Sequence, residues 1–314
     1  MSVEAPAPIP PRGLSWLDEF SFGRQGLVYR KTGARVALSR SLMQELGAWL
    51  TFYFAVEREA ARLPKTFTIA FSPDRGRPWY LIWAAVKLAG GRIATRAGDA
   101  DLVMHFEDAT FSPNAPPTSR GRLINFDCSD VSKSRVAEAF EEAFGYPLAI
   151  DPARHSGPAV EKSELNGAHD GHIVTCPKQA LPGRVYQRLV DNQRGDLVED
   201  LRCPTIAGRP VVVFIKRRPV TKRFANANVE VELKAPEDVF SADELSRIAA
   251  FAHRLGLDWG GLDVLRDRQE GRLYIVDANK TDMGPPTALP LKEKLAATRM
   301  LASAFRAHFI EGAR

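Results

Sequence analysis

The stretch that decides the fold expected of this chain is GLDVLRDRQEGRLYIVDANK, residues 261–280. It reads as two strands, residues 262–267 and 272–279, joined by a short turn that contains glycine. Because successive side chains of a strand point to opposite faces, Asp277 and Asn279 leave the same face. This hairpin is therefore the first candidate for a polar site on a sheet.

The register of the hairpin decides whether Asp263 lies beside Asp277. A four-residue turn would send the two carboxylates to opposite faces, whereas a three-residue turn over residues 269–271 would place them directly opposite each other. Gly271 favours the three-residue turn, which ends with a residue in the left-handed backbone region. We therefore predict that the two carboxylates face each other.

Two carboxylates and an amide oxygen on one sheet face point to a metal ion. The carboxylates would repel each other unless a cation lay between them. Magnesium prefers hard oxygen ligands and usually combines one or two carboxylates with nucleotide phosphates, and manganese is an alternative. The sequence predicts Asp263, Asp277 and Asn279 as the metal ligands.

This pattern resembles the ATP-grasp family, in which the nucleotide lies between two α+β lobes and magnesium is held by an acidic residue followed by Glu-x-Asn on the next strand. The resemblance covers roughly residues 126–312, and residues 66–125 look like the α/β domain that usually precedes the lobes. Asp263 and Asn279 match the pattern, while Asp277 is one methylene shorter than the usual Glu. Whether one or two metal ions are held stays open.

The resemblance also implies residues that contact the nucleotide's phosphates. Lys133 is similar to the first nucleotide-contacting lysine of the family, and Lys162 to the second, which precedes a flexible loop containing glycine. Here Asn166 and Gly167 open that loop. Glycine lets backbone amides approach phosphate oxygens closely, and a lysine adds a point charge.

Residues 185–191 (VYQRLVD) resemble the hinge between the lobes, where backbone groups read the adenine edge and an acidic residue reaches the ribose. The resemblance implies nucleotide contacts from Gln187, Arg188, Leu189 and Asp191. Further along, Arg218 and Asn228 are similar to the family's phosphate-contacting arginine and substrate-side asparagine, and both are predicted to be catalytic. Lys216 shares the face of Arg218 and is predicted to bind the cofactor, while Arg217 points away.

The chain as a whole is predicted to have an α+β fold. Periodic patterns with start and stop signals predict helices at residues 41–62, 79–89, 132–144, 241–255 and 291–309. Four regions are expected: a flexible tail (1–13), a hairpin with an aromatic helix (14–65), an α/β domain of the kind that precedes ATP-grasp lobes (66–126), and the ATP-grasp lobes (127–312) with their hinge near 186–192. The second half opens as a mostly antiparallel sheet.

The predicted helix at 41–62 is unusually aromatic, because Trp49, Phe52, Tyr53 and Phe54 exceed one apolar face. A helix buried between domains, or in a homodimer, explains this composition. Attachment to a membrane surface is less favoured, because the polar face of the helix is not cationic enough.

The composition excludes several classes. Lysine and arginine outnumber aspartate and glutamate only 43 to 38, and the densest basic run includes the predicted phosphate contacts, so no nucleic-acid partner is expected. Three distant cysteines fit neither disulfides nor a zinc site. No membrane span or signal peptide is recognised, which predicts a cytoplasmic protein. The roles of His169 and His172 stay open.

The resemblance implies an ATP- and magnesium-dependent ligase that activates a carboxylate as an acyl phosphate and joins it to an amine. Its partners would be small-molecule or peptide-like acids and amines. The alternatives are an ATP-dependent phosphotransferase acting on a hydroxyl and a nucleotide-binding protein without turnover. Arg75, Arg77, Arg217 and Arg223 are candidates for binding an acidic acceptor, whose identity stays open.

Overall fold

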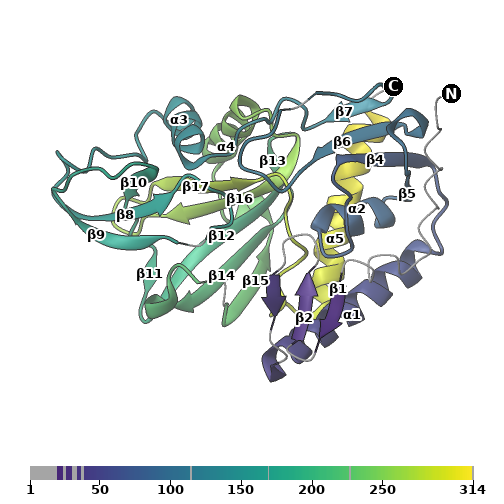
Figure 1. Cartoon of the computed structure of the whole chain (residues 1–314), viewed down its shortest axis with the longest axis horizontal. Coiled ribbons are helices and arrows are strands. Elements are labelled where there is room, and N and C mark those ends of the chain that lie inside the picture. The colour runs from purple at the N-terminus through teal and green to yellow at the C-terminus, as the bar shows by residue number, and fades with distance from the viewer. Residues whose placement is uncertain are drawn as a thin grey trace.

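The computed structural model describes residues 20–23, 26–29, 34–36, 39–113, 115–168, 170–225 and 228–312. Figure 1 shows two regions side by side: the N-terminal elements with the C-terminal helix, and the sheets of the middle of the chain with helices above them. The predicted tail at 1–13 and His169 lie outside the described residues. The mixed α+β fold expected from the sequence is present.

The described chain begins with a small antiparallel sheet and a long helix. These elements are β1 (Phe20–Gly23), β2 (Gly26–Tyr29), β3 (Ala34–Val36) and α1 (Arg40–Ala60). Pairing of β2 with β3 confirms the predicted hairpin. One face of α1 is buried, and its Tyr53 ring stacks on Trp83 with centroids 5.3 Å apart. The aromatic helix therefore packs within its own chain, although Met43 and Phe54 remain exposed.

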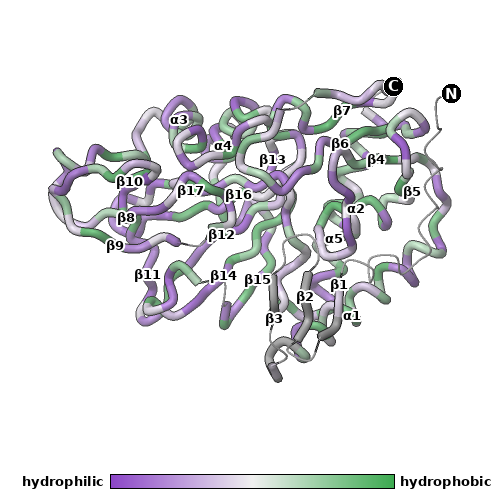
Figure 2. The backbone as a smooth tube through the Cα atoms, in the orientation of Figure 1, coloured by the Kyte–Doolittle hydropathy of each residue, from purple (hydrophilic) through white to green (hydrophobic). Residues whose placement is uncertain are grey.

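A parallel sheet of order β5-β4-β6-β7 follows. Its elements are β4 (Phe67–Pro73), α2 (Leu81–Leu88), β5 (Gly91–Ile93), a 3-10 turn (Ala97–Asp99), β6 (Leu102–Phe106) and β7 (Arg122–Ile124). Hydrophobic segments run along β4, β6 and α2 in Figure 2, as expected for a buried parallel strand pair and a helix packed on it. The three-residue β5 was not predicted, because it is too short to show a pattern.

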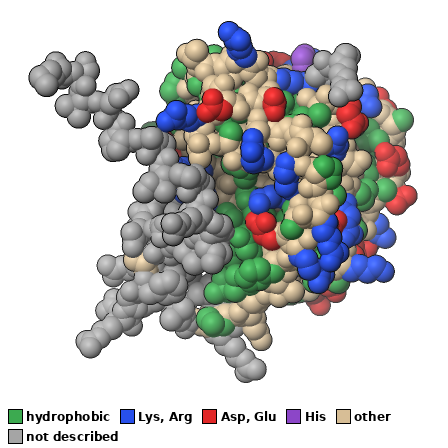
Figure 3. Space-filling view, turned by 90° about the vertical axis from the view of Figure 1, so that its right-hand side faces the viewer, with side chains coloured by type: hydrophobic (Ala, Val, Ile, Leu, Met, Phe, Trp, Pro, Cys, Tyr) green, Lys and Arg blue, Asp and Glu red, His purple; other side chains and the backbone are tan. Residues whose placement is uncertain are grey.

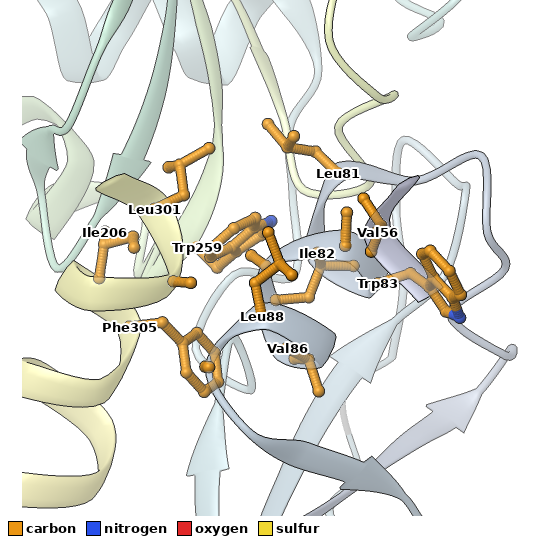
Figure 4. Packing of buried hydrophobic residues seen from close by; sticks show 14 of the residues in the cluster. Val56, Leu81, Ile82, Trp83, Val86, Leu88, Ile206, Trp259, Leu301 and Phe305 are labelled. Carbon is orange, nitrogen blue, oxygen red and sulfur yellow. The ribbon is translucent and has the colours of Figure 1, made fainter. Parts of the chain in front are cut away.

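The C-terminal helix belongs to the core of the N-terminal region. It consists of α5 (Leu291–Phe305) and a π-helical turn (Arg306–Glu311). In Figure 4, Leu301 and Phe305 of this helix lie in the same cluster as Leu88 of α2 and Trp259 of the middle region. Burial of apolar surface thus holds α5 against α1 and α2. Figure 3 views this side, where hydrophobic side chains gather at the lower centre and charged side chains of both signs are scattered above and to the right of them.

The middle of the chain contributes a small antiparallel sheet of order β10-β8-β9 and a helix. The elements are α3 (Lys133–Phe144), β8 (Gly157–Ser163), β9 (His172–Cys176) and β10 (Arg184–Arg188). Ser132 caps α3 by accepting a hydrogen bond from the Arg135 backbone N–H at 3.2 Å. Gly145 ends the helix with a φ of 79° in the left-handed region. Both boundaries agree with the sequence prediction.

The larger sheet is antiparallel, with order β15-β14-β12-β16-β17 and two short strands paired to β12. Its elements are β11 (Gln193–Arg194), β12 (Leu197–Ile206), β13 (Arg209–Pro210), β14 (Val213–Pro219), a 3-10 turn (Val220–Lys222), β15 (Glu230–Lys234), a 3-10 turn (Pro236–Asp238), α4 (Ala242–Arg254), β16 (Trp259–Arg266) and β17 (Leu273–Asn279). A capping box of Ser241 and Glu244 begins α4, where the sequence predicts the start of this helix. α3 and α4 cover one face of this sheet, so the other face is left for polar side chains.

The predicted three-residue turn of the β16–β17 hairpin is wrong. Arg266 pairs with Leu273, and the Asp267 N–H donates to the Arg272 carbonyl at 2.8 Å, so residues 268–271 form a four-residue turn. The Asp267 carboxylate stabilises this turn by accepting two backbone N–H groups within it, at 2.9 and 3.0 Å. Gly271 does adopt the expected left-handed backbone, with a φ of 72°.

A β-bulge restores the predicted alignment of the two carboxylates. The register shifts by one residue between Asp263 and Val264, so that Val264 pairs with Ile275 but Asp263 pairs with Asp277. Val276 is the extra residue of the bulge. The prediction that Asp263 lies opposite Asp277 is therefore confirmed, although the bulge and not the turn brings it about.

Candidate functional site

The face of the larger sheet that α3 and α4 leave open is here called the charged face. It carries nearly all of the charged residues singled out from the strands of this sheet. Alternation along the strands and the pairing between them place seven side chains on this face: Asp200, Arg202, Lys216, Arg218, Asp263, Asp277 and Asn279. The intervening residues, such as Leu201, Leu262 and Ala278, lie in the core below α3 and α4. Because successive side chains of a strand point to opposite faces, the sheet has one charged face and one apolar face.

Arg217 takes the opposite direction from its neighbours, as predicted. Its Nε donates to Glu199 at 2.9 Å and its Nη1 to Glu232 at 2.6 Å. Arg217 is one of the four candidates for binding an acidic acceptor, and its guanidinium is held by these two carboxylates away from the charged face.

Lys133, at the start of α3, and Lys162, on β8, both reach β17. The Lys133 ammonium, almost fully buried, lies 2.5 Å from Oδ1 of Asp277 and 3.4 Å from Oδ1 of Asn166. Lys162 donates to the Val276 carbonyl at 3.0 Å, which is the carbonyl of the bulged residue. The bulge therefore both aligns the carboxylates and offers a backbone acceptor to a lysine.

Burial is the main reason that the pKa of Lys162 is lowered to about 8; the Asp277 carboxylate opposes this shift, and the Lys133 cation adds to it. An ammonium in this environment has few partners among the described residues. Anionic oxygens of a ligand would complete its contacts and favour its charged form.

Asp263 lies between two cations. Arg202 Nη1 donates to its Oδ2 at 2.9 Å, and the Lys216 ammonium lies 3.4 Å from its Oδ1. Burial alone would raise the pKa of this carboxyl, but Arg202 and Lys216 outweigh burial and hold it below its ordinary value. Asp263 is therefore kept ionised, as a metal ligand must be.

The two predicted catalytic residues are brought into contact. Arg218 Nη1 donates to Oδ1 of Asn228 at 3.2 Å, and Arg218 also forms an ion pair with Asp200. Its Nε donates to the Arg223 carbonyl at 2.8 Å. Arg218 is buried and fully engaged, and Arg223 in turn contacts Asn192 beside the hinge.

The glycine-containing loop lies against α3 and the α/β region. Gly167 has a φ of 71°, a backbone conformation that suits glycine. The Asn166 N–H donates to the Thr110 hydroxyl at 2.8 Å, and the Ser134 N–H near the start of α3 donates to Glu164 at 3.1 Å. The loop is therefore placed beside Lys133, as the predicted phosphate role requires.

Among the predicted hinge residues, Gln187 and Arg188 point to opposite faces of the smaller sheet. Gln187 is buried, lies on the same face of the smaller sheet as Lys162, and its Nε2 has no hydrogen-bond partner among the described residues. Arg188 points the other way and pairs with Glu270 at the hairpin turn, while its N–H donates to the Leu148 carbonyl. Leu189 is half-buried directly after β10.

Asp191 and Asn279 are both held by nearby backbone. Oδ1 of Asp191 accepts the Gln193 N–H at 3.2 Å. Oδ1 of Asn279 accepts the Thr281 N–H at 2.8 Å.

The remaining candidate residues lie elsewhere. Arg75 and Arg77 follow β4, at the carboxyl end of the parallel sheet. His172 is exposed and faces Glu161 at 3.6 Å, on the side of the smaller sheet away from Lys162.

Three residues of this site were not predicted from the sequence: Asp200, Arg202 and Asp282. Arg202 pairs with Asp263 across β12 and β16, and Asp282 follows Asn279 by three residues. Asp200 and Arg202 alternate on β12, which is a sign of a polar face, but Asp263, the partner of Arg202 on β16, lies more than sixty residues away in sequence. The contact therefore depends on the sheet order.

The donor set fits magnesium and a nucleotide. Within the described residues, no three His, Cys, Asp or Glu side chains are grouped so that they could hold a metal, so a metal here would rely on Asp263, Asp277, the Asn279 amide and ligand oxygens. Magnesium commonly binds in this way, through one or two carboxylates and phosphates. The Gln187 Nε2, which has no hydrogen-bond partner among the described residues, and the lysines could form polar contacts with the rest of a nucleotide.

The chain is similar to ATP-grasp ligases. The structure titled PsnB with minimal precursor, Mg and ADP has a TM-score of 0.46 at 11% identity, covering 76% of this chain and 98% of that one. D-alanine–D-alanine ligase from Bacillus anthracis complexed with ATP has a TM-score of 0.45 at 12% identity, covering 78% and 97%.

A RimK domain protein from Sphaerobacter thermophilus DSM 20745, also titled ATP-grasp, has a TM-score of 0.44 at 16% identity, covering 76% of this chain and 98% of that one. No protein-family model and no curated protein matches the sequence. In the part of the chain that the structure describes, no helix is both long and apolar enough to cross a membrane.

Proposed function

We propose that this chain is an ATP- and magnesium-dependent ligase of the ATP-grasp type, which joins a carboxylate to an amine. The observation that carries the proposal is the pairing of Asp263 with Asp277 on the open sheet face, with Lys133, Lys162 and Lys216 around them. Mutually repulsive carboxylates held beside three lysines form a site suited to a metal and phosphates together.

The residues divide into a metal end and a nucleotide end. Asp263, Asp277 and Asn279 would hold magnesium, which would supply charge neutralisation to the phosphate oxygens. Lys133 and Lys162 would bind the phosphates beside the loop that contains Gly167. At the hinge, the buried Gln187 amide and the backbone after Arg188 would contact the base, with Asp191 near the ribose. Lys216 would contact the phosphates from β14.

In the proposed reaction, a carboxylate oxygen of the acid attacks the γ-phosphorus of ATP, and the bond to the β-phosphate oxygen breaks to release ADP. The amine then attacks the acyl carbon of the acyl phosphate, the carbon–oxygen bond to phosphate breaks, and the nitrogen loses a proton. Positioning and charge neutralisation supply the catalysis. Arg218 and Asn228 would act on the side of the substrate.

The test is to follow phosphorus and acyl products while acids and amines are supplied separately. With magnesium, ATP and a panel of carboxylic acids, we expect ADP formation that depends on the acid. Added hydroxylamine should then trap the acyl phosphate as a hydroxamate. A stable phosphate ester on a hydroxyl compound, with no hydroxamate, would establish the phosphotransferase instead.

Nucleotide binding provides a check that needs no substrate. At a hundredfold excess of MgATP over its Kd, the free energy of unfolding should rise by about 2.7 kcal/mol. Thermal melts with and without MgATP, with a known ATP-binding protein as positive control, measure this shift. Stabilisation by MgATP without ADP formation from any acid or hydroxyl compound would favour a nucleotide-binding protein without turnover.

A further inference from the structure

Arg202 and Asp282 form an ion pair beside the proposed metal site, and the proposed function assigns neither of them a role. Arg202 Nη2 pairs with Oδ1 of Asp282, and its Nε lies 3.2 Å from the same oxygen. The side chain of Asp282 is 5% exposed and that of Arg202 is 14% exposed. The pair is therefore shielded from water and geometrically specific.

The guanidinium divides its donors between two carboxylates. One edge, Nε and Nη2, is held by Asp282, and the remaining nitrogen, Nη1, donates to Oδ2 of Asp263 at 2.9 Å. A guanidinium has a fixed fork of donors, so an edge engaged with one carboxylate cannot form a bidentate contact with another. With that edge held by Asp282, Arg202 makes one hydrogen bond to Asp263, from Nη1.

The fold makes room for this arrangement at Gly261. A Cβ atom at this position would lie 2.7 Å from Nη2 of Arg202 and would also overlap the Asp282 carboxylate. Any other residue at position 261 would thus displace the pair. The glycine lies two residues before Asp263 on the same face of β16.

Asp282 itself is held by the α/β region. Its carbonyl accepts the Leu81 N–H at the start of α2 at 2.9 Å, and the Gly284 N–H donates to the Trp79 carbonyl at 2.8 Å. The isolated bridge between Tyr80 and Met283 continues this pairing. The position of Asp282 is therefore fixed from outside the sheet that carries Asp263.

We propose that Arg202 and Asp282 are positioning residues for Asp263: Asp282 retains one edge of the guanidinium, and Arg202 orients the Asp263 carboxylate while leaving it able to bind a divalent cation. This inference rests on the proposed function, because it concerns the metal ligand. Without Asp282, the guanidinium would turn to Asp263 with both nitrogens and compete with the metal. Groups that orient a metal ligand typically change metal affinity by about 10- to 100-fold when altered.

The experiment compares the wild type with Asp282→Asn and Arg202→Lys. Arg217→Lys is the matched control, because Arg217 is on the same sheet, is similarly buried at 15% side-chain exposure, and also bridges two carboxylates, but on the other face. Calorimetry measures ATP binding without divalent cations, and electron paramagnetic resonance measures Mn²⁺ binding, with and without ATP. Thermal melts confirm that each variant is folded.

We expect Asp282→Asn and Arg202→Lys to weaken Mn²⁺ binding by about tenfold or more, with metal-free ATP affinity within about twofold of the wild type and no change in Arg217→Lys. Equal loss of Mn²⁺ and metal-free ATP binding would overturn the inference, because it would indicate a general structural role. So would Mn²⁺ affinities indistinguishable from the control. A wild type that binds neither ATP nor Mn²⁺ would overturn the proposed function as well. If Asp282→Asn does not fold, Arg202→Lys alone decides between these outcomes.

Discussion

The two faces of the sheet β15-β14-β12-β16-β17 are made by the same strands but are stabilised in different ways. The face under α3 and α4 buries apolar side chains such as Leu262, Val264 and Ala278, all completely inaccessible. The other face holds Asp263 and Asp277 among lysines and arginines. Burial of apolar surface contributes about 25 cal/mol per Å², whereas buried ion pairs contribute little net stability because their desolvation offsets their attraction.

This contrast separates the residues that stabilise the sheet from those that we propose bind ligands. The apolar face can hold the sheet together without help from the charged face. Substitutions on the first face should therefore change the free energy of unfolding, and substitutions on the second should change ligand binding or turnover.

The largest expected effect is on the apolar face. Leu262→Ala should lower the free energy of unfolding by about 2–5 kcal/mol, because it removes a fully buried side chain and leaves a cavity. Urea unfolding measures the change. Nucleotide affinity, measured at a temperature where the variant is folded, should stay within about twofold of the wild type. Loss of affinity in a folded Leu262→Ala chain would contradict the separation of the faces.

The next effect is on the charged face. Asp277→Asn should reduce magnesium-dependent turnover by about 100- to 1000-fold, the usual size for loss of an electrostatic contact at a reaction centre. The amide oxygen can still accept a hydrogen bond from Lys133, which lies 2.5 Å from Oδ1 in the wild type. The unfolding free energy should therefore change by less than about 1.5 kcal/mol. Turnover at the wild-type rate would remove Asp277 from the site.

A pH dependence is expected from Lys162, whose pKa burial lowers to about 8. Below this pKa the ammonium is charged and attracts phosphates, and above it the charge is lost. ATP affinity should therefore fall as pH rises through 8, by up to about tenfold per unit if only the charged form binds. Calorimetry between pH 7 and 9 measures this. In Lys162→Met the dependence should vanish, and its persistence there would assign the titration to another group.

The smallest effect is expected at the hairpin turn. Because the bulge at Val276 sets the pairing of Asp263 with Asp277, one glycine inserted after Glu270 should lengthen the loop without moving the carboxylates. The loop-closure cost of one residue is below about 0.6 kcal/mol. Turnover within about twofold of the wild type is the expected result. Complete loss of turnover would mean that the turn length does set the register.

The sequence predicts the charged hairpin correctly, but its predicted turn is one residue too short. Gly271 adopts the predicted backbone, yet the Asp267 carboxylate stabilises a longer turn by accepting two N–H groups. Residues 267–272 are compatible with either a three-residue or a four-residue turn. The hydrogen bonds that favour the four-residue turn come from the Asp267 side chain and form only once the turn is made, so the sequence alone does not distinguish the two turns. The alternation of residues along 272–279 does not reveal the bulge at Val276 either.

The nucleotide side was predicted in part. Lys133 and Lys162 do reach β17, and the buried Gln187 amide lies on the same sheet face as Lys162. The side chain of Arg188 points away to Glu270, a direction set by its position on β10. The roles of these residues, the limits of the four predicted regions and a homodimer through α1 remain predictions.

By itself, the sequence determined the local elements and which residues share a strand face, because these depend on spacing along the chain and on capping residues such as Ser132 and Gly145. Only the tertiary structure decided that α5 completes the N-terminal core and that Arg202 lies between Asp263 and Asp282. Both arrangements bring together residues that are far apart in sequence. The order of the strands and the burial of apolar surface select them, and neither is encoded in the spacing of a single segment.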